Sequence, residues 1–208
     1  MDITYFYKGL IIGLSIAAPV GPIGILCINR TLSSGRMVGL LSGLGAATAD
    51  ALYGSVAAFG LTFISAFLVQ QQIWFRLVGG IFLCFLGLRT MLTKTSSIPL
   101  QSSSGSMLNA YGSTLFLTLT NPLTILAFIA IFSGIGLISL GGSYSSAGIT
   151  VLGVFLGSAC WWFILSSLTN LFRTRLNLAT LKWVNRISGL VILGFGFIAL
   201  VGVYSIIR

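Results

Sequence analysis

Long apolar stretches alternate with short polar segments along the whole chain. A helix that crosses a hydrocarbon core of about 30 Å needs about 20 mainly apolar residues. Six stretches meet this requirement, so the pattern predicts an all-α membrane protein with six transmembrane helices. The predicted spans are Gly9–Ile28, Val38–Ala58 with an apolar extension to Val69, Ile73–Met91, Thr114–Ile135, Ala147–Leu168 and Val184–Tyr204.

A polar, Ser-rich connection over residues 93–112 divides the chain into two halves of three spans each, residues 1–92 and 113–208. Because each half has an odd number of spans, the halves must be inverted relative to each other if they are repeats. Similar features recur in the same order: the Pro19–Pro22 element of the first span corresponds to Asn121-Pro122 of the fourth, and a Gly-xxx-Gly spacing occurs in the second and fifth spans. We therefore expect a 3+3 inverted repeat with broken first and fourth helices, the architecture of many secondary transporters.

The composition agrees with a membrane protein and excludes several other classes. Hydrophobic residues make up 56% of the chain and charged residues 6%, which is too few charges for a soluble surface. No His and only two acids are present, so an ordinary metal site of His and carboxylate ligands is not expected. The chain has no G-x-x-x-x-G-K-[ST] motif, so it does not hydrolyse ATP by that route. We expect a protein that is not an enzyme and has no cofactor.

The basic residues indicate how the chain is oriented in the membrane. The formal net charge is +9, but the eleven Lys and Arg are scattered, which argues against a nucleic-acid partner. Eight lie near the loops after the first, third and fifth spans, whereas three, Lys8, Arg76 and Arg208, lie on the other side. Because cytoplasmic loops are enriched in Lys and Arg, we expect those three loops in the cytoplasm and both termini outside.

The first span contains Pro19, Gly21 and Pro22. A proline inside a helix cannot donate to the carbonyl four residues earlier, so two prolines around a glycine predict a broken helix. Gly21 lets the backbone open, and Gly24 lets another group approach closely. The amides of residues 23–25 would form a new helix N-terminus that attracts anions, beside freed carbonyls that attract cations. This arrangement suits a zwitterion, and a simple packing kink is the alternative.

Asp50 is the one acidic residue inside a predicted span, and the rise of the helix places it near the middle of the membrane. Burying a carboxylate there costs about 3 kcal/mol on insertion scales, so we expect it to bind a proton or a cationic group. The alternative is a carboxyl that only holds helices together. Tyr53, one turn away, is expected to hydrogen-bond the acid, and Trp161 or Trp162 to contact a cationic substrate. A packing role for Trp161 or Trp162 is the alternative.

Two runs, APVGPIGILCINRTLSSGRMVGLLSGLGAATADALYG and TLTNPLTILAFIAIFSGIG, resemble the lysine exporter (LysE) family of bacterial inner-membrane amino-acid exporters. The resemblance extends over essentially the whole chain. It implies secondary export of an amino acid or close derivative, by exchange with protons and driven by the proton motive force. It also implies a substrate and coupling site formed by Pro19, Gly21, Pro22, Asp50, Asn121 and Pro122. Ala49 stands where many members have Gly, a departure that bears on substrate choice.

Two other functions fit parts of the sequence. A divalent-cation exporter would use Asp50 and the freed carbonyls, although one acid and no His make a poor divalent site. A membrane thiol relay would bring Cys27 and Cys160 together from the two halves, although each lies singly in an apolar run and fits core packing. The expected partners are the amino-acid substrate and membrane lipid. The sequence leaves the choice between monomer and homodimer open.

Overall fold

The computed structural model describes residues 3–19, 21–59, 67, 70–92, 104–121, 124–125, 127–128, 144–173 and 178–207. Within these ranges it contains seven helices and no strand, which confirms the all-helical prediction. The helices are α1 (Ile3–Ala17), α2 (Pro22–Ser34), α3 (Arg36–Ala58), α5 (Gln72–Leu92), α6 (Ser104–Leu119), α8 (Tyr144–Arg173) and α9 (Leu178–Ile207). Helices are the expected elements because apolar segments in lipid must satisfy their backbone groups internally.

Three of these helices, α5, α8 and α9, are long and apolar enough to cross a membrane, and the bent pair of α1 and α2 brings the number to as many as four. The 23-residue helix α3 is less apolar because it carries several Gly and Ser residues and Asp50. α6 begins at Ser104, well before the predicted start at Thr114, so part of the predicted linker is helical. Residues 93–103 lie outside the described residues.

The first predicted span is broken, as its prolines indicate. Gly21 is extended, with φ −96° and ψ −163°, and Pro22 occupies the first turn of α2. Proline is favoured there because an amide hydrogen at that position has no partner within the helix. The axes of α1 and α2 differ by 79°. The amide of Ile25 donates to the carbonyl of Gly21 at 3.1 Å, so this amide belongs to the first turn of α2 and is not offered to a ligand.

A second interruption follows α6. The amide of Asn121 donates to the carbonyl of Thr118 at 3.2 Å, which closes the end of that helix. The carbonyl of Asn121 then accepts hydrogen bonds from the amides of Thr124 and Ile125, at 3.1 and 3.3 Å, which begins a new turn. The break predicted for the fourth span is therefore present at Asn121. Pro122, the predicted cause, lies outside the described residues.

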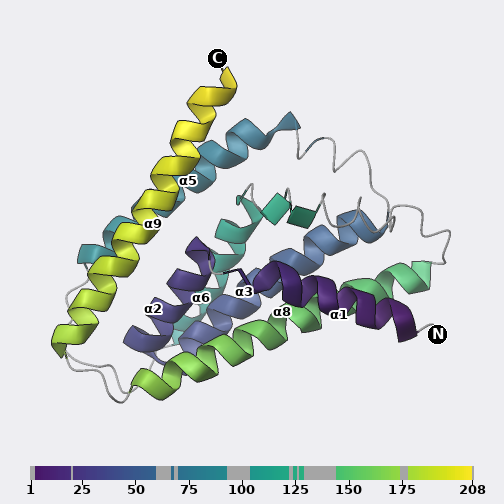
Figure 1. Ribbon diagram of the computed structural model, residues 1–208, viewed down its shortest axis with the longest axis horizontal. Coiled ribbons are helices and arrows are strands. Elements are labelled where there is room, and N and C mark those ends of the chain that lie inside the picture. The colour runs from purple at the N-terminus through teal and green to yellow at the C-terminus, as the bar shows by residue number, and fades with distance from the viewer. Residues whose placement is uncertain are drawn as a thin grey trace.

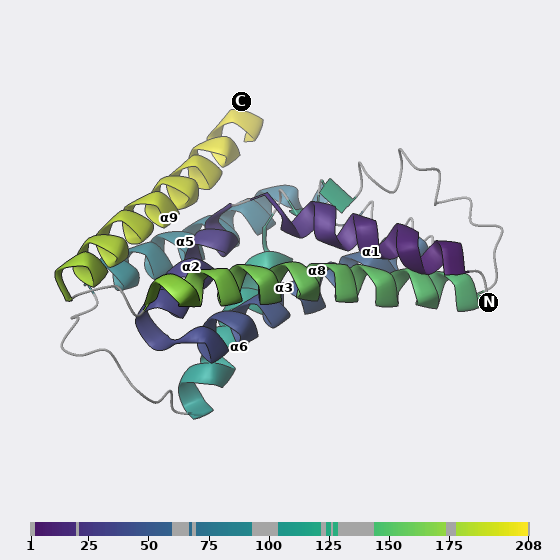
Figure 2. The same cartoon turned by 60° about the horizontal axis from the view of Figure 1, so that its bottom comes forward.

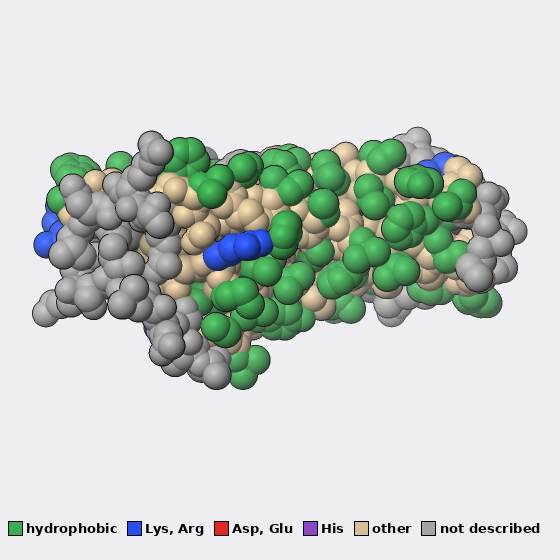
Figure 3. All heavy atoms as spheres, turned by 90° about the horizontal axis from the view of Figure 1, so that it is seen from below, with side chains coloured by type: hydrophobic (Ala, Val, Ile, Leu, Met, Phe, Trp, Pro, Cys, Tyr) green, Lys and Arg blue, Asp and Glu red, His purple; other side chains and the backbone are tan. Residues whose placement is uncertain are grey.

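The helices pack in characteristic pairs. α5 lies along α9, and α1 lies along α8, in both views (Figure 1 and Figure 2). α3 packs against both α6 and α8, and α2 contacts α3, α8 and α9 in the interior. Among the described residues on the face seen in Figure 3, apolar side chains are spread along most of its length, as a lipid-facing surface requires. α2, which begins at the first break, therefore lies among packed helices.

Glycines allow two close approaches of the backbone. Gly9 and Gly13 of α1 face α8, and a Cβ at either position would overlap a backbone carbonyl, that of Thr150 or Val154. Such contacts are typical of helices that associate through small residues in membranes. Gly35, between α2 and α3, has a φ of 103° and is the one described residue with positive φ. This conformation, which other residues rarely adopt, joins the two helices through a tight turn.

Candidate substrate site

A cavity of about 380 Å³ lies at the two helix breaks. Its walls come from α1, α2, α3, α6, α8 and α9 and from the residues that follow α6. Apolar walls include Ile16, Ala46 and Phe195. The predicted site residues that line it are Pro19, Gly21, Pro22, Gly24, Asp50 and Asn121. The fold thus brings together groups from both halves of the chain that the sequence separates by about a hundred positions.

Asp50 is almost fully buried, at 3% exposure, and contributes to the cavity wall from α3. The hydroxyl of Ser158 in α8 donates to its Oδ2 at 2.6 Å. The indole Nε1 of Trp162, one turn further along α8, donates to that same Ser158 oxygen at 3.1 Å. The described contacts that orient this carboxyl therefore come from neutral groups, and a cation that entered the cavity would meet the acid directly.

Two predicted site residues lie elsewhere. The Tyr53 hydroxyl donates to the carbonyl of Leu119 at 2.5 Å, so it binds the end of α6 and not Asp50. Trp161 packs half-buried against the neighbouring hydrophobic core, whereas Trp162 is 4% exposed and lines the cavity. One residue along a helix turns a side chain by about 100°, because there are 3.6 residues per turn. Of the two tryptophans considered for this position, Trp162 therefore lines the cavity.

The structure adds polar residues that the sequence reading missed. Ser158 is the hydrogen-bond donor to Asp50, and Thr118 and Thr124 line the cavity on either side of the second break. A signal for Ser158 was available. It lies four residues before Trp162, so the two side chains share one face of α8. The threonines gave no signal, because such residues are common in transmembrane helices.

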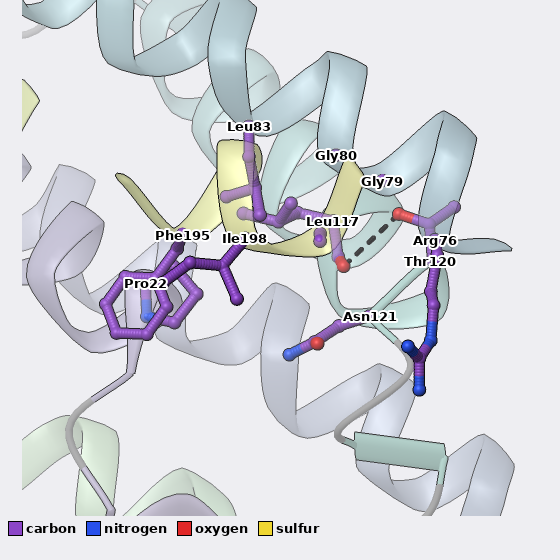
Figure 4. A pocket seen from close by; sticks show the side chains of 11 residues that line it. Pro22, Arg76, Gly79, Gly80, Leu83, Leu117, Thr120, Asn121, Phe195 and Ile198 are labelled. Carbon is purple, nitrogen blue, oxygen red and sulfur yellow. Dashed lines mark hydrogen bonds between the residues drawn. The ribbon is translucent and has the colours of Figure 1, made fainter. Parts of the chain in front are cut away.

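A smaller cavity of about 180 Å³ adjoins the first and shares Pro22, Asn121 and Phe195 with it. It lies against α5 and α9. Figure 4 shows Pro22 and Phe195 on one side of this cavity and Asn121 and Arg76 on the other. The Arg76 Nη1 donates to the carbonyl of Gly202 at 3.4 Å, so this guanidinium spans from α5 to α9. The site near Asp50 thus continues towards a basic side chain.

The structure gives less support to the two alternative functions, divalent-cation export and a thiol relay. Within the described residues, no group of three or more His, Cys, Asp and Glu side chains is close enough to hold a metal ion. Cys27 is buried in the hydrophobic core, whereas Cys160 is exposed on α8, and both are free thiols. The two cysteines proposed for a relay therefore face different surroundings.

Comparison with known proteins gives consistent results. The family model described as LysE type translocator matches residues 14–202. The "Putative amino acid efflux protein YcgF" of Bacillus subtilis (strain 168) is 31% identical over 197 residues, which cover 92% of this chain and 93% of that protein. The threonine efflux protein of Salmonella typhimurium (strain LT2) is 26% identical over 213 residues, covering 94% and 97%. The uncharacterized membrane protein YahN of Escherichia coli (strain K12) is 34% identical over about half of each chain. No solved structure matched this chain.

Proposed function

Because this chain belongs to the LysE type translocator family, we propose that it exports amino acids across the bacterial inner membrane by exchange with protons. The relatives named as efflux proteins for amino acids and for threonine support the substrate class. The observation that carries the proposal is the position of Asp50, which lines a cavity beside the N-terminus of α2. One wall is acidic and the other is the positive end of a helix.

This cavity suits a zwitterion. The substrate ammonium would bind the Asp50 carboxylate, and its carboxylate would lie at the N-terminus of α2, where the helix dipole favours negative charge. The substrate side chain would contact the apolar faces of Trp162 and Phe195. The volume of about 380 Å³ lies within the range of small-molecule sites.

Proton exchange would follow from competition for one carboxyl. When the cavity opens to the cytoplasm, charged Asp50 binds the substrate ammonium. When it opens to the outside, a proton binds the carboxylate and the substrate leaves. The protonated carboxyl then returns and releases its proton inside. Ser158 can serve both forms, because a hydroxyl donates to a carboxylate or accepts from a carboxyl.

We further propose the 3+3 inverted repeat, with six spans and both termini outside. The pairing of helices supports it. α1 begins the first half and packs on α8, the second span of the other half. α6 begins the second half and packs on α3, the second span of the first half. The two contacts are therefore equivalent when the halves are exchanged. α5 and α9, the last helix of each half, pack on each other. Alternating access would follow as one repeat rocks against the other around the cavity.

The test is amino-acid release from dipeptide-loaded bacterial cells that express the chain or its Asp50→Asn variant. Asn keeps the shape and the bond to Ser158 but carries no charge and exchanges no proton at this position. We expect faster release of one class of amino acid with the wild type and none above background with the variant. Cys160→Ser, at an exposed position of the same bundle, serves as the matched control. Wild-type release that persists in Asp50→Asn would remove Asp50 from the mechanism, and no release from the wild type would refute the amino-acid proposal.

A further inference from the structure

The smaller cavity of about 180 Å³, which adjoins the cavity at Asp50, has mainly apolar walls. We call it the α5–α9 pocket, after the two helices that contribute most of its described lining residues. An apolar cavity of about 150 Å³ is large enough to bind benzene, so this pocket has room for a side chain of about the size of leucine. Its apolar lining side chains are Pro22, Leu83, Leu117, Phe195, Ile198 and Ala199.

The α5–α9 pocket begins where the substrate carboxylate is expected to bind. Pro22, Asn121 and Phe195 line both this pocket and the cavity at Asp50, so they form the boundary between the two (Figure 4). Pro22 is also the first residue of α2, and the N-terminus of that helix favours an anion. A substrate with its carboxylate at this N-terminus would therefore have its side chain next to the pocket.

The pocket offers no partner to a second ammonium group. The chain contains only two acidic residues, Asp2 and Asp50. Asp50 lies in the wall of the other cavity, and no acid is among the described residues that line the pocket. The charged side chain among them is Arg76, which has the same sign as an ammonium group. Because burying a charge without a partner is costly, the pocket disfavours the side chains of lysine and arginine.

We propose that the α5–α9 pocket receives the side chain of the substrate, and that the exported amino acid is neutral, with an apolar side chain of about the size of leucine. This inference rests on the proposed amino-acid export and adds the class of substrate to it. One methylene group in an apolar pocket changes specificity about 10- to 200-fold. We therefore expect leucine to be preferred over alanine by at least about tenfold in kcat/KM, and lysine not to compete with leucine.

Competition between substrates in inside-out vesicles tests the proposal through Ala199→Leu. Labelled leucine and alanine are supplied together at equal concentrations, because the ratio of their initial rates then equals the ratio of their kcat/KM values and does not depend on how much protein is folded. A larger side chain at position 199 fills part of the pocket, so we expect the preference for leucine to fall at least about tenfold. Ala179→Leu is the matched control, since Ala179 is exposed on the same helix and does not line the pocket.

A second variant changes the pocket in the opposite direction. Leu83 is buried on α5, and Leu83→Ala enlarges the pocket from that side. We expect the rate for phenylalanine relative to leucine to rise about tenfold in this variant. Unchanged ratios in Ala199→Leu and Leu83→Ala, or export of lysine by the wild type as fast as that of leucine, would overturn the proposal while leaving amino-acid export in place.

A binding measurement separates this inference from the proposed function. Purified protein in phosphatidylcholine nanodiscs is unfolded by heat with leucine, alanine or lysine at the same concentration and ionic strength. We expect leucine to raise the melting temperature more than alanine in the wild type and in Ala179→Leu, but not in Ala199→Leu. Equal effects of leucine and alanine on the wild type would overturn the proposal. Stabilisation by leucine without transport of any amino acid would refute the proposed function while leaving the pocket as a binding site for an apolar side chain.

Discussion

The contact between α1 and α8 leaves no room for a side chain at Gly157. A Cβ there would overlap the carbonyl oxygen of Leu10 and would lie 2.9 Å from its carbonyl carbon and 3.0 Å from the amide nitrogen of Leu14. These atoms are backbone atoms of α1, so no rotamer change can relieve the overlap. Gly157→Ala must therefore separate the two helices.

The size of the effect follows from two opposing terms. Ala is favoured over Gly within a helix by about 1 kcal/mol. Overpacking of a close contact costs about 1–3 kcal/mol, and a rigid backbone contact belongs at the upper end. We therefore expect Gly157→Ala to lose about 2 kcal/mol of stability, which corresponds to a fall in melting temperature of about 4–8 °C for a chain of this length.

Gly148→Ala in the same helix provides the control. Among the described residues, no atom of another helix lies within 4 Å of a Cβ at Gly148, so this change gains the helix preference without an overlap. Its melting temperature should rise by about 2–4 °C, from about 1 kcal/mol of helix preference. Both variants are measured by thermal unfolding of purified protein in the same detergent. If Gly157→Ala melts at or above the wild-type temperature, the described packing of α1 on α8 is wrong.

Two further changes test individual contacts. Tyr53→Phe removes the hydroxyl that donates to the carbonyl of Leu119 at the end of α6, so the melting temperature should fall by at least about 2 °C. Transport driven by a pH gradient should keep its pH dependence, because Tyr53 does not bind Asp50. A changed pH dependence would return Tyr53 to the coupling site. The double change Cys27→Ser and Cys160→Ser should leave the transport rate unaltered when it is measured per folded molecule, and abolished transport would revive the thiol relay.

The sequence predicted the features whose causes are local. The break at Pro19–Pro22 follows from missing amide hydrogens, and the burial of Asp50 inside the bundle follows from its charge in an apolar span. Both effects depend on the residue itself and its immediate neighbours. The same is true of the interruption at Asn121, which was inferred from the adjoining proline.

The remaining features depend on how one helix is rotated against another. The partner of Asp50 is Ser158, which is 108 positions away and belongs to the other half of the chain. Trp161 and Trp162 lie in a helix with apolar residues on every side, so the hydrophobic pattern did not indicate which of the two side chains faces the interior of the bundle. Tyr53 lies one turn from Asp50, but its long side chain places the hydroxyl at α6. Such pairings require the assembled bundle.

The hydrophobic core beside the Asp50 cavity has a consequence for the energy supply of the cell. A continuous file of water through this core would let protons cross without substrate and would discharge the membrane potential, which stores about 2.3 kcal/mol per charge at 100 mV. Core side chains such as Leu26, Leu86 and Ile192 offer water no hydrogen-bond partner and so oppose such a file. Export and insulation therefore place opposite demands on the same few side chains, which must part for a solute and close before an ion can follow.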